Sequence, residues 1–239
     1  MKVAITFIGT NRYLDFLPHY YENIEKYFLP NTEKVILAFT DGELSDTPDN
    51  LKVYKQEHLD WPFITLKRFE IINKARDVID QCDWLVFIDA DALPVTTITE
   101  EEFFKDKPLF GVHHPCHFLG MEPHTKAPGA YEQNPKCEAY VDVSKSLPPV
   151  YWQGCLWGGK VPYVCAMIDE LQARVNRDLE NDIVAVWHDE TQINRYFLER
   201  TQDVHTFGPS YAFPEVFESH CNFSPKIVHL AKDNSKYHQ

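Results

Sequence analysis

Two aspartates, Asp89 and Asp91, stand one residue apart directly after the apolar run at residues 84–88. Carboxylates at this spacing can hold a divalent cation together with a diphosphate, whose charge the cation neutralises. If residues 84–88 form a buried strand, the pair lies at its carboxyl end, where α/β proteins bind their ligands. The alternative is a solvated turn at the strand end in which the aspartates bind nothing.

The segment Trp187-His188-Asp189-Glu190 places four functional side chains in a row at the predicted start of a helix. An indole can stack on a sugar face, and a carboxylate can stabilise or attack an oxocarbenium-like centre. Acidic residues in a first helical turn also cap the helix and interact favourably with its dipole. The segment therefore indicates either a sugar site or a capping segment.

A glycine-rich stretch, Tyr-Trp-Gln-Gly-Cys-Leu-Trp-Gly-Gly, occupies residues 151–159. Glycine allows the backbone to approach a ligand closely. The same stretch is also typical of a turn between a strand and a helix. It is not a phosphate-binding P-loop, because the Gly-Lys-Ser/Thr ending is missing.

Histidines and cysteines are numerous but do not follow zinc-binding patterns. The clustered histidines, which we predict to make hydrogen bonds and line a cleft, are His113, His114, His117 and His124. The cysteines, which form no Cys-x-x-Cys pair and which we predict to be reduced core residues, are Cys82, Cys116, Cys137, Cys155, Cys165 and Cys221. Arg68 is either an ordinary surface base or a group that reaches the same strand end as the aspartates.

The elements that must position these residues alternate between strand and helix in the first half of the chain. Apolar, strand-like segments are found at residues 2–9, 34–40, 51–55 and 84–88, and helical spacing at residues 13–28 and 63–82. This alternation predicts an α/β fold with a mostly parallel central sheet flanked by helices. Further along, the patterns predict long loops over 115–149, helices over 162–180 and 188–200, and a strand over 226–231.

The overall composition excludes several classes of protein. The 239 residues carry a formal net charge of −13, which disfavours binding to nucleic acid or to an anionic membrane surface. A hydrophobic content of 44% excludes wholesale disorder. No run approaches the roughly 20 apolar residues of a membrane span, and the first residues are strand-like rather than a signal peptide. We therefore expect a cytoplasmic protein without a membrane anchor.

Together these segments resemble glycosyltransferase family 6, which contains the histo-blood-group A and B transferases and the α-1,3-galactosyltransferases. The most specific match is residues 181–198, which are similar to the family's Trp-His-Asp-Glu helix on both flanks. Three further matches occur in the order that the family has: the Asp-x-Asp pair, Ala130-Tyr131-Glu132 with Ala139-Tyr140, and Gly158-Gly159. Four matches in register are far more specific than any one of them.

The resemblance implies a GT-A type, Rossmann-like fold in a single catalytic domain over 1–239. Residues 1–92 would form the nucleotide-binding half, residues 93–231 the half that holds the acceptor and the donor sugar, and residues 232–239 a mobile tail. The implied reaction is retaining transfer of galactose or N-acetylgalactosamine from a UDP sugar. The product is an α-1,3 linkage to the 3-hydroxyl of a galactose-containing, 2′-fucosylated oligosaccharide, and the cofactor is Mn²⁺ or another divalent cation.

The resemblance also implies a role for individual residues. Glu190 corresponds to the catalytic carboxylate, which either acts as a nucleophile or stabilises a front-face transition state, and Asp89 and Asp91 correspond to the metal ligands. Acceptor contacts are implied for His114, Trp187 and Glu190. Donor contacts are implied for Phe7, Ile8, Gly9, Thr10, Tyr13, Arg68, Asp89, Ala90, Asp91, Gln153, Gly154, Cys155, His188, Asp189 and Lys232.

Some features depart from the family pattern. The triplet Gln153-Gly154-Cys155, at the position that tunes donor choice, matches neither the mammalian galactose nor the N-acetylgalactosamine form, so the sequence leaves the donor open. It also leaves open the natural acceptor and the oligomeric state. Two other functions use the same scaffold: a UDP-sugar hydrolase, and a carbohydrate-binding protein without catalysis. Intact Asp89, Asp91 and Glu190 argue against the second.

Overall fold

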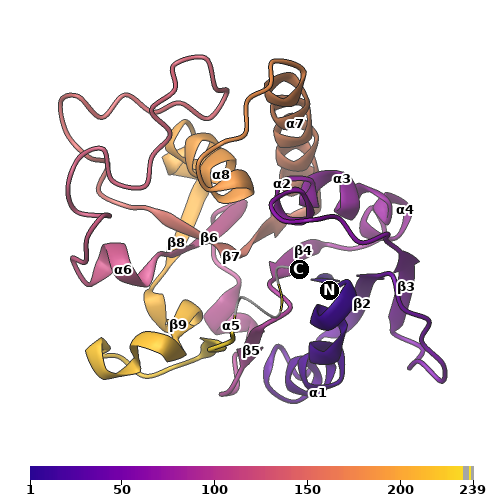
Figure 1. Cartoon of the computed structure of the whole chain (residues 1–239). Coiled ribbons are helices and arrows are strands. Elements are labelled where there is room, and N and C mark those ends of the chain that lie inside the picture. The colour runs from indigo at the N-terminus through magenta and orange to yellow at the C-terminus, as the bar shows by residue number, and fades with distance from the viewer. Residues whose placement is uncertain (234–236, 238–239) are drawn as a thin grey trace.

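The computed structural model of the chain describes residues 1–233 and residue 237. A seven-stranded central sheet lies between helices on its two faces, and a three-stranded sheet accompanies it (Figure 1). The predicted α/β fold with a mostly parallel sheet flanked by helices is thereby confirmed.

Across the central sheet the strand order is β3 (Leu51–Lys55), β2 (Glu33–Thr40), β1 (Lys2–Ile8), β4 (Trp84–Ile88), β7 (Trp152–Lys160), β6 (Leu109–His113) and β8 (Val204–Phe207). The first four strands of this order run parallel to one another. β7 is antiparallel to both of its neighbours, β4 and β6, and β8 is parallel to β6. Strands from both halves of the sequence therefore share one sheet.

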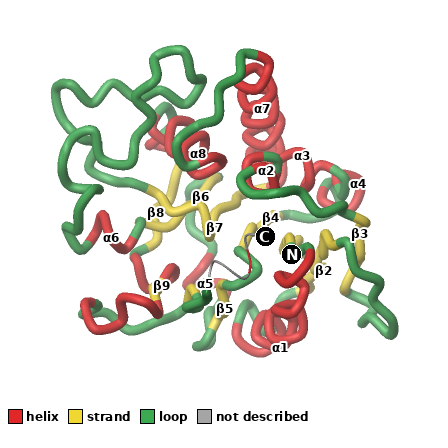
Figure 2. The backbone as a smooth tube through the Cα atoms, viewed as in Figure 1, coloured by secondary structure: helices red, strands yellow, loops and turns green. Residues whose placement is uncertain are grey.

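Both faces of the central sheet are buried, which explains the unbroken apolar runs in β1, β2 and β4. One face packs against α1 (Leu17–Tyr27) and α5 (Glu100–Phe103). The other packs against α7 (Val161–Glu180) and α8 (His188–Leu198). Figure 2 shows α1 and α7 on opposite sides of the strands.

Residues 63–82 do not form the single long helix that their spacing predicts. They form α2 (Phe63–Leu66), α3 (Arg68–Asn73) and α4 (Arg76–Ile79), separated by non-helical backbone at Lys67 and Ala75. Most apolar side chains of the three short helices pack into one core, although Phe63 at the start of α2 is 39% exposed. The break at Lys67 also turns Arg68 inward, where it is 7% exposed.

The glycine-rich stretch is the strand β7 rather than a turn. A Cβ atom at Gly158 would lie 2.2 Å from the carbonyl oxygen of Leu85, and one at Gly159 would lie 2.4 Å from that of Pro108. These two glycines therefore serve the close approach of neighbouring backbone, not the approach of a ligand.

Other differences are small: some element boundaries move, and short helices appear where none were predicted. The helix expected at 13–28 begins as a 3-10 helix, Asn11–Phe16, and continues as α1. The loops over 115–149 contain one short helix, α6 (Pro115–Phe118). Three more 3-10 helices follow α8, at Thr201–Asp203, Pro209–Ala212 and Glu215–His220. All six cysteines are free, and the prediction of core positions is confirmed for four of them. It is wrong for Cys116 and Cys221, which are only partly buried.

The smaller sheet brings the end of the chain to the aspartate pair. Its strands are β5 (Ala92–Pro94), β10 (Ile227–His229) and β9 (Phe213–Pro214), with β10 in the middle. β10 pairs antiparallel with β5, so that His229 lies opposite Ala92, the residue after Asp91. In the tail predicted to be mobile, residues 234–236 and 238–239 lie outside the described residues.

Candidate active site

Asp89 and Asp91 follow β4 directly, as predicted, and the two carboxylates have different surroundings. Asp91 is 2% exposed, and its Oδ1 lies 3.2 Å from the Nε2 of His229. Its Oδ2 accepts a hydrogen bond from the ammonium of Lys232. Burial alone would raise the pKa of Asp91, but His229 and Lys232 together hold this pKa well below its usual range. Asp91 is therefore ionised and already paired.

Arg68 joins the aspartates to the start of α8. One of its nitrogens lies 3.2 Å from Asp89 and the other 2.9 Å from Asp189. The second nitrogen also donates to the carbonyl oxygen of Gly154 at 3.0 Å. The guanidinium stacks over the ring of Phe87, 4.4 Å from its centroid. Arg68 is thus a buried cation that holds three segments together, not an ordinary surface base.

Glu190 and Asp189 form a second acidic pair at the first turn of α8. The Oε2 of Glu190 accepts a hydrogen bond from the backbone N–H of Gly154 at 2.8 Å. Burial raises the pKa of Glu190 to about 7, although the Gly154 amide and Tyr151 oppose the rise. Burial also raises the pKa of Asp189 to about 7 against the charge of Arg68. Both carboxyls are therefore poised to titrate near neutrality.

Two buried polar side chains hold this pair in place. Asn194, one turn after Glu190, accepts from the backbone N–H of Trp152 at 2.9 Å and donates to its carbonyl at 2.7 Å. Glu132 accepts from the backbone N–H of Val186 at 2.8 Å. Between these anchors His188 has φ 52°, a left-handed conformation that costs a non-glycine residue about 1–3 kcal/mol. The fold thus fixes the turn that carries Glu190.

A pocket opens at the carboxyl ends of β1 and β4. Of the residues predicted to bind the donor, it is lined by Ile8, Thr10, Tyr13, Arg68, Asp89, Ala90, Asp91 and Lys232. Phe7 lies behind the pocket, fully buried against Tyr20 at a ring distance of 5.1 Å. Gly9 is also behind it, and a Cβ atom there would meet the Phe7 ring at 2.4 Å. These two residues shape the wall from within.

A second hollow adjoins this pocket and contains the rest of the predicted donor residues. It is lined by Gln153, Gly154, Cys155, Trp187, His188, Asp189 and Glu190, together with Arg68, Asp89 and His229. Trp187 is 48% exposed, so its indole is free to meet a ligand. Across from it, the exposed Trp61 packs edge-on against His188 at 4.8 Å.

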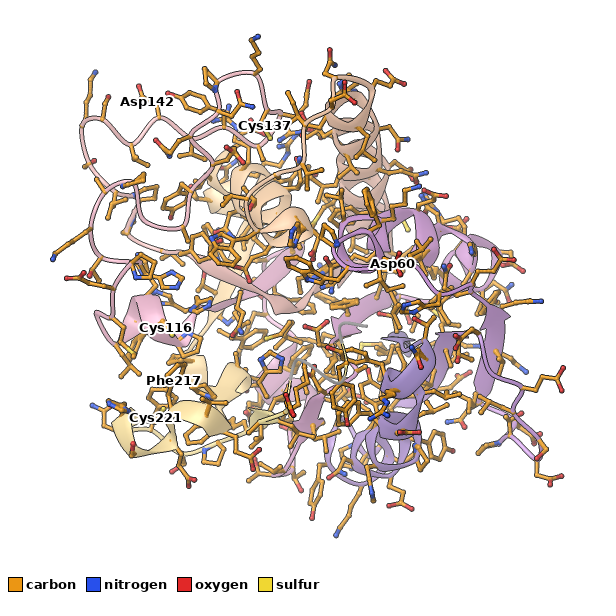
Figure 3. The ribbon with its side chains drawn as sticks, in the orientation of Figure 1. Asp60, Cys116, Cys137, Asp142, Phe217 and Cys221 are labelled. Atoms are coloured by element: carbon orange, nitrogen blue, oxygen red, sulfur yellow. The ribbon has the colours of Figure 1, made fainter. Side chains whose placement is uncertain are left out.

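His114 lies on a third hollow, with Gln153, Phe217, His229 and Lys232. Figure 3 shows its neighbour Cys116 on the same side of the molecule as Phe217. The predicted hydrogen bonding is confirmed for His113 and His117, which share a hydrogen bond of 2.8 Å. It is wrong for His124, whose Nδ1 is buried without a hydrogen-bond partner among the described residues. The Nδ1 of His114 accepts from the backbone N–H of Cys116 at 3.1 Å.

Within the described part of the chain, two groups of side chains place metal-binding atoms within 4.8 Å of one another. One is His114, Cys116 and His124, despite a spacing that does not match zinc patterns. The other is Asp89, Asp91 and His229. Two carboxylates and one imidazole are a donor set that fits a divalent cation such as Mn²⁺. The predicted metal residues are therefore brought together, and the structure adds a histidine.

Comparison with known proteins decides the family. A sequence model described as glycosyltransferase family 6 matches residues 1–237. The chain belongs to glycosyltransferase family 6. This family implies a nucleotide-sugar donor and a glycan acceptor, its members generally depend on a divalent cation, and the mixed sheet described above is its GT-A-like fold.

Individual relatives are distant in sequence. The O-antigen biosynthesis glycosyltransferase WbnI of Escherichia coli is 26% identical over 240 residues, which cover 100% of this chain and 98% of that protein. The histo-blood group ABO system transferase 2 of Rattus norvegicus is 26% identical over 239 residues, or 96% of this chain and 68% of that protein. The globoside alpha-1,3-N-acetylgalactosaminyltransferase 1 of Mus musculus is 25% identical over 207 residues, or 83% of this chain and 57% of that protein.

For this family 6 chain, sequence reasoning missed His229, Asn194 and Glu132 as parts of the site. His229 lies in a short apolar strand whose pairing with β5 has no local signal in the sequence. Asn194 and Glu132 act through buried hydrogen bonds to distant backbone, although Glu132 does belong to a segment that resembles the family. Among the described residues, no helix combines the length and the apolar content needed to cross a membrane.

Proposed function

We propose that this protein is a retaining glycosyltransferase that moves galactose or N-acetylgalactosamine from a UDP sugar to the 3-hydroxyl of a galactose-containing, 2′-fucosylated acceptor. The observation that carries the proposal is the position of Glu190. Its carboxylate is held on the Gly154 amide and lines the hollow that also contains Arg68 and Asp89. The globoside relative is an alpha-1,3-N-acetylgalactosaminyltransferase by name, which supports an α-1,3 linkage.

In the proposed donor complex, residues 1–92 bind the nucleotide. Uridine lies against Ile8, Thr10 and Tyr13, on the wall that Phe7 and Gly9 shape from behind. The diphosphate lies at Asp89 and Asp91, where a bound Mn²⁺ or similar cation would neutralise the charge of the leaving UDP. Lys232, which lines the same pocket, adds a positive charge beside it.

The donor sugar occupies the hollow between the aspartates and α8. Arg68, His188 and Asp189 orient it, and the triplet Gln153-Gly154-Cys155 forms the floor that distinguishes galactose from N-acetylgalactosamine. Cys155 is 2% exposed, so it acts through the shape of the strand rather than by direct chemistry.

In the proposed reaction the bond between the anomeric carbon and the β-phosphate oxygen breaks, and its electrons leave with UDP. Glu190 lies beneath the developing positive charge, as an ionised carboxylate that either attacks the carbon or stabilises it. The acceptor's 3-hydroxyl then forms the new bond to the anomeric carbon, displacing Glu190 where that carboxylate has attacked, and its proton passes to the β-phosphate oxygen of the departing UDP. Trp187 stacks on the acceptor galactose and His114 contacts it, both from the half formed by residues 93–231.

The deciding experiment measures UDP release from a panel of UDP sugars, with Mn²⁺ or a chelator, and with or without 2′-fucosyllactose. We expect release that requires Mn²⁺, increases with the acceptor and occurs with one galacto-configured donor, and an α-linked product by NMR. Release that ignores every galactoside acceptor would identify a UDP-sugar hydrolase. Glycan binding without release from any donor would identify a carbohydrate-binding protein.

A further inference from the structure

The segment around β10 delivers two side chains to one carboxylate. Nε2 of His229 lies 3.2 Å from one oxygen of Asp91, and the ammonium of Lys232 is bonded to the other. The backbone N–H of Leu230, between them, donates to the carbonyl of Asp91 at 2.9 Å. Both carboxylate oxygens are therefore occupied by groups from the last part of the chain.

A cation at Asp89 and Asp91 must compete with one of these two groups. Asp91 is 2% exposed, so an approaching cation meets a carboxylate that the protein has already paired rather than a hydrated one. An ammonium and a metal ion bound to the same buried carboxylate repel each other, because both are positively charged. A neutral imidazole, in contrast, can give its lone pair to a metal that Asp91 also binds.

The two groups also differ in how firmly the fold holds them. His229 belongs to β10, which is paired with β5 at Ala92 and with β9 at Pro214. Lys232 follows the strand and holds its ammonium at the end of a flexible stem. Its other neighbour is the ring of Tyr13, 4.9 Å from the ammonium, on the wall proposed to bind uridine.

Gln153 supplies the hydrogen bond that a ligating His229 needs. Nδ1 of His229 lies 3.4 Å from the Gln153 side-chain nitrogen. The amide oxygen of Gln153 is buried and has no hydrogen-bond partner in the part of the chain that the structure describes. Rotating the amide by half a turn lets this oxygen accept the Nδ1 proton, which leaves the Nε2 lone pair for a metal ion.

We propose that His229 is a third protein ligand of the divalent cation, and that Lys232 is a place-holder whose ammonium leaves Asp91 when the cation enters. This inference rests on the proposed cation dependence of the transferase. Cation entry then frees Lys232 beside Tyr13, where it can meet the donor diphosphate. The nitrogen ligand makes the site prefer Mn²⁺ to Mg²⁺, since Mg²⁺ favours oxygen ligands and Mn²⁺ tolerates imidazole.

The test measures Mn²⁺ binding by calorimetry, on the full chain and without any donor, so that it does not depend on catalysis. His229→Ala should weaken Mn²⁺ binding by about tenfold or more. Lys232→Ala should tighten it by roughly tenfold, as expected if the competing ammonium leaves about a tenth of the molecules free to bind. Misfolding would weaken Mn²⁺ binding in both variants. Weaker binding in His229→Ala together with tighter binding in Lys232→Ala therefore identifies the exchange.

Matched controls separate this exchange from general charge effects. Lys67→Ala removes an equal charge from a lysine that pairs with Glu70 at 4.0 Å, and His205→Ala removes a histidine from β8; both should leave Mn²⁺ affinity unchanged. His229→Asp should retain cation binding but lose preference for Mn²⁺ over Mg²⁺.

Unchanged Mn²⁺ affinity in His229→Ala, or weaker binding in Lys232→Ala, would overturn the proposal. These outcomes are distinct from failure of the proposed function. If the transfer reaction is absent but the two variants behave as stated, the transferase assignment falls while the cation exchange stands. If transfer is present and the variants bind Mn²⁺ like the parent protein, only the exchange falls.

Discussion

The site contains two pairs of carboxylates that the fold treats in opposite ways. Asp91 meets His229 and Lys232, which outweigh its burial and hold its pKa well below the usual range. Asp189 and Glu190, one segment away, are dominated by burial, which raises both of their pKa values to about 7. Arg68 touches both pairs, at Asp89 and at Asp189. Asp91 is charged in advance to receive a cation, whereas Asp189 and Glu190 are poised to titrate near pH 7.

The largest expected effect comes from removing the Glu190 carboxylate. Glu190→Gln keeps the size of the side chain but cannot carry negative charge, so kcat should fall by roughly 100-fold or more while UDP binding is retained. Transfer rates and UDP calorimetry measure the two quantities. Glu180→Gln, at the exposed end of α7, is the control. Parent-like turnover in Glu190→Gln would remove this residue from the reaction.

Removing charge from the other pair should act on the cation instead. Asp91→Asn leaves Lys232 and His229 facing a neutral amide, so Mn²⁺ affinity should fall by at least about tenfold and activity should fall with it. Activity that persists in a chelator would contradict the proposed cation dependence. If Asp91→Asn and Glu190→Gln both reduced Mn²⁺ affinity equally, the functional division between the two pairs would be wrong.

The pH dependence of activity should report the second pair. The proposed reaction needs ionised Glu190, whose pKa is about 7, so kcat should rise as pH increases through 7 and fall about tenfold per unit well below it. Rates at saturating donor and acceptor check this. A flat profile between about pH 5 and about pH 8 would show that Glu190 is ionised throughout that range.

Stability should change with pH in the opposite direction. Folding raises the pKa of Glu190 from 4.5 to about 7, so the folded chain binds a proton more tightly than the unfolded chain does. This contribution to the free energy of unfolding is complete below 4.5 and is lost as pH rises through 7. Urea unfolding at several pH values measures how the free energy of unfolding changes with pH. In Glu190→Gln this change should be smaller than in the parent protein, and an equal change in both would assign the pH dependence to other groups.

The sequence predicted these pairs better than it predicted their electrostatics. Apolar runs located β1, β2 and β4, and local motifs located Asp89, Asp91 and Glu190, because each signal lies within a few consecutive residues. The difference between the pairs depends on contacts between residues far apart. His229 lies 138 residues from Asp91, and Glu190 lies 36 residues from the Gly154 amide.

The helix predicted over residues 63–82 was wrong for the same reason. Its apolar spacing is compatible with one long helix, and nothing local specifies breaks at Lys67 and Ala75. The breaks accompany contacts with distant residues, such as those that Arg68 makes with Asp89 and Asp189. Likewise, the glycines of 151–159 could be assigned to a turn because the strands on each side of β7 come from distant parts of the chain.

The smallest expected effect tests how closely Gly154 packs against Asp189 and Glu190. In Gly154→Ala the new Cβ would lie 3.2 Å from Cβ of Glu190 and 3.4 Å from a carboxylate oxygen of Asp189, so α8 must shift by a few tenths of an ångström. The hydrogen bond from the backbone N–H of residue 154 to Glu190 would lengthen. Since this hydrogen bond lowers the pKa of Glu190, weakening it should raise that pKa. The midpoint of the pH–rate profile should therefore move upward, with a loss of a few-fold in kcat at pH 7.

Mn²⁺ affinity should not change in Gly154→Ala, because the change does not touch Asp91, His229 or Lys232. Gly208→Ala is the matched control: a Cβ atom there has no neighbour within 4 Å in the described residues, so both the pH profile and Mn²⁺ binding should be unaffected. If Gly154→Ala left the pH profile unshifted but weakened Mn²⁺ binding, the two carboxylate pairs would be coupled through Arg68. They would then not act as two independent sites.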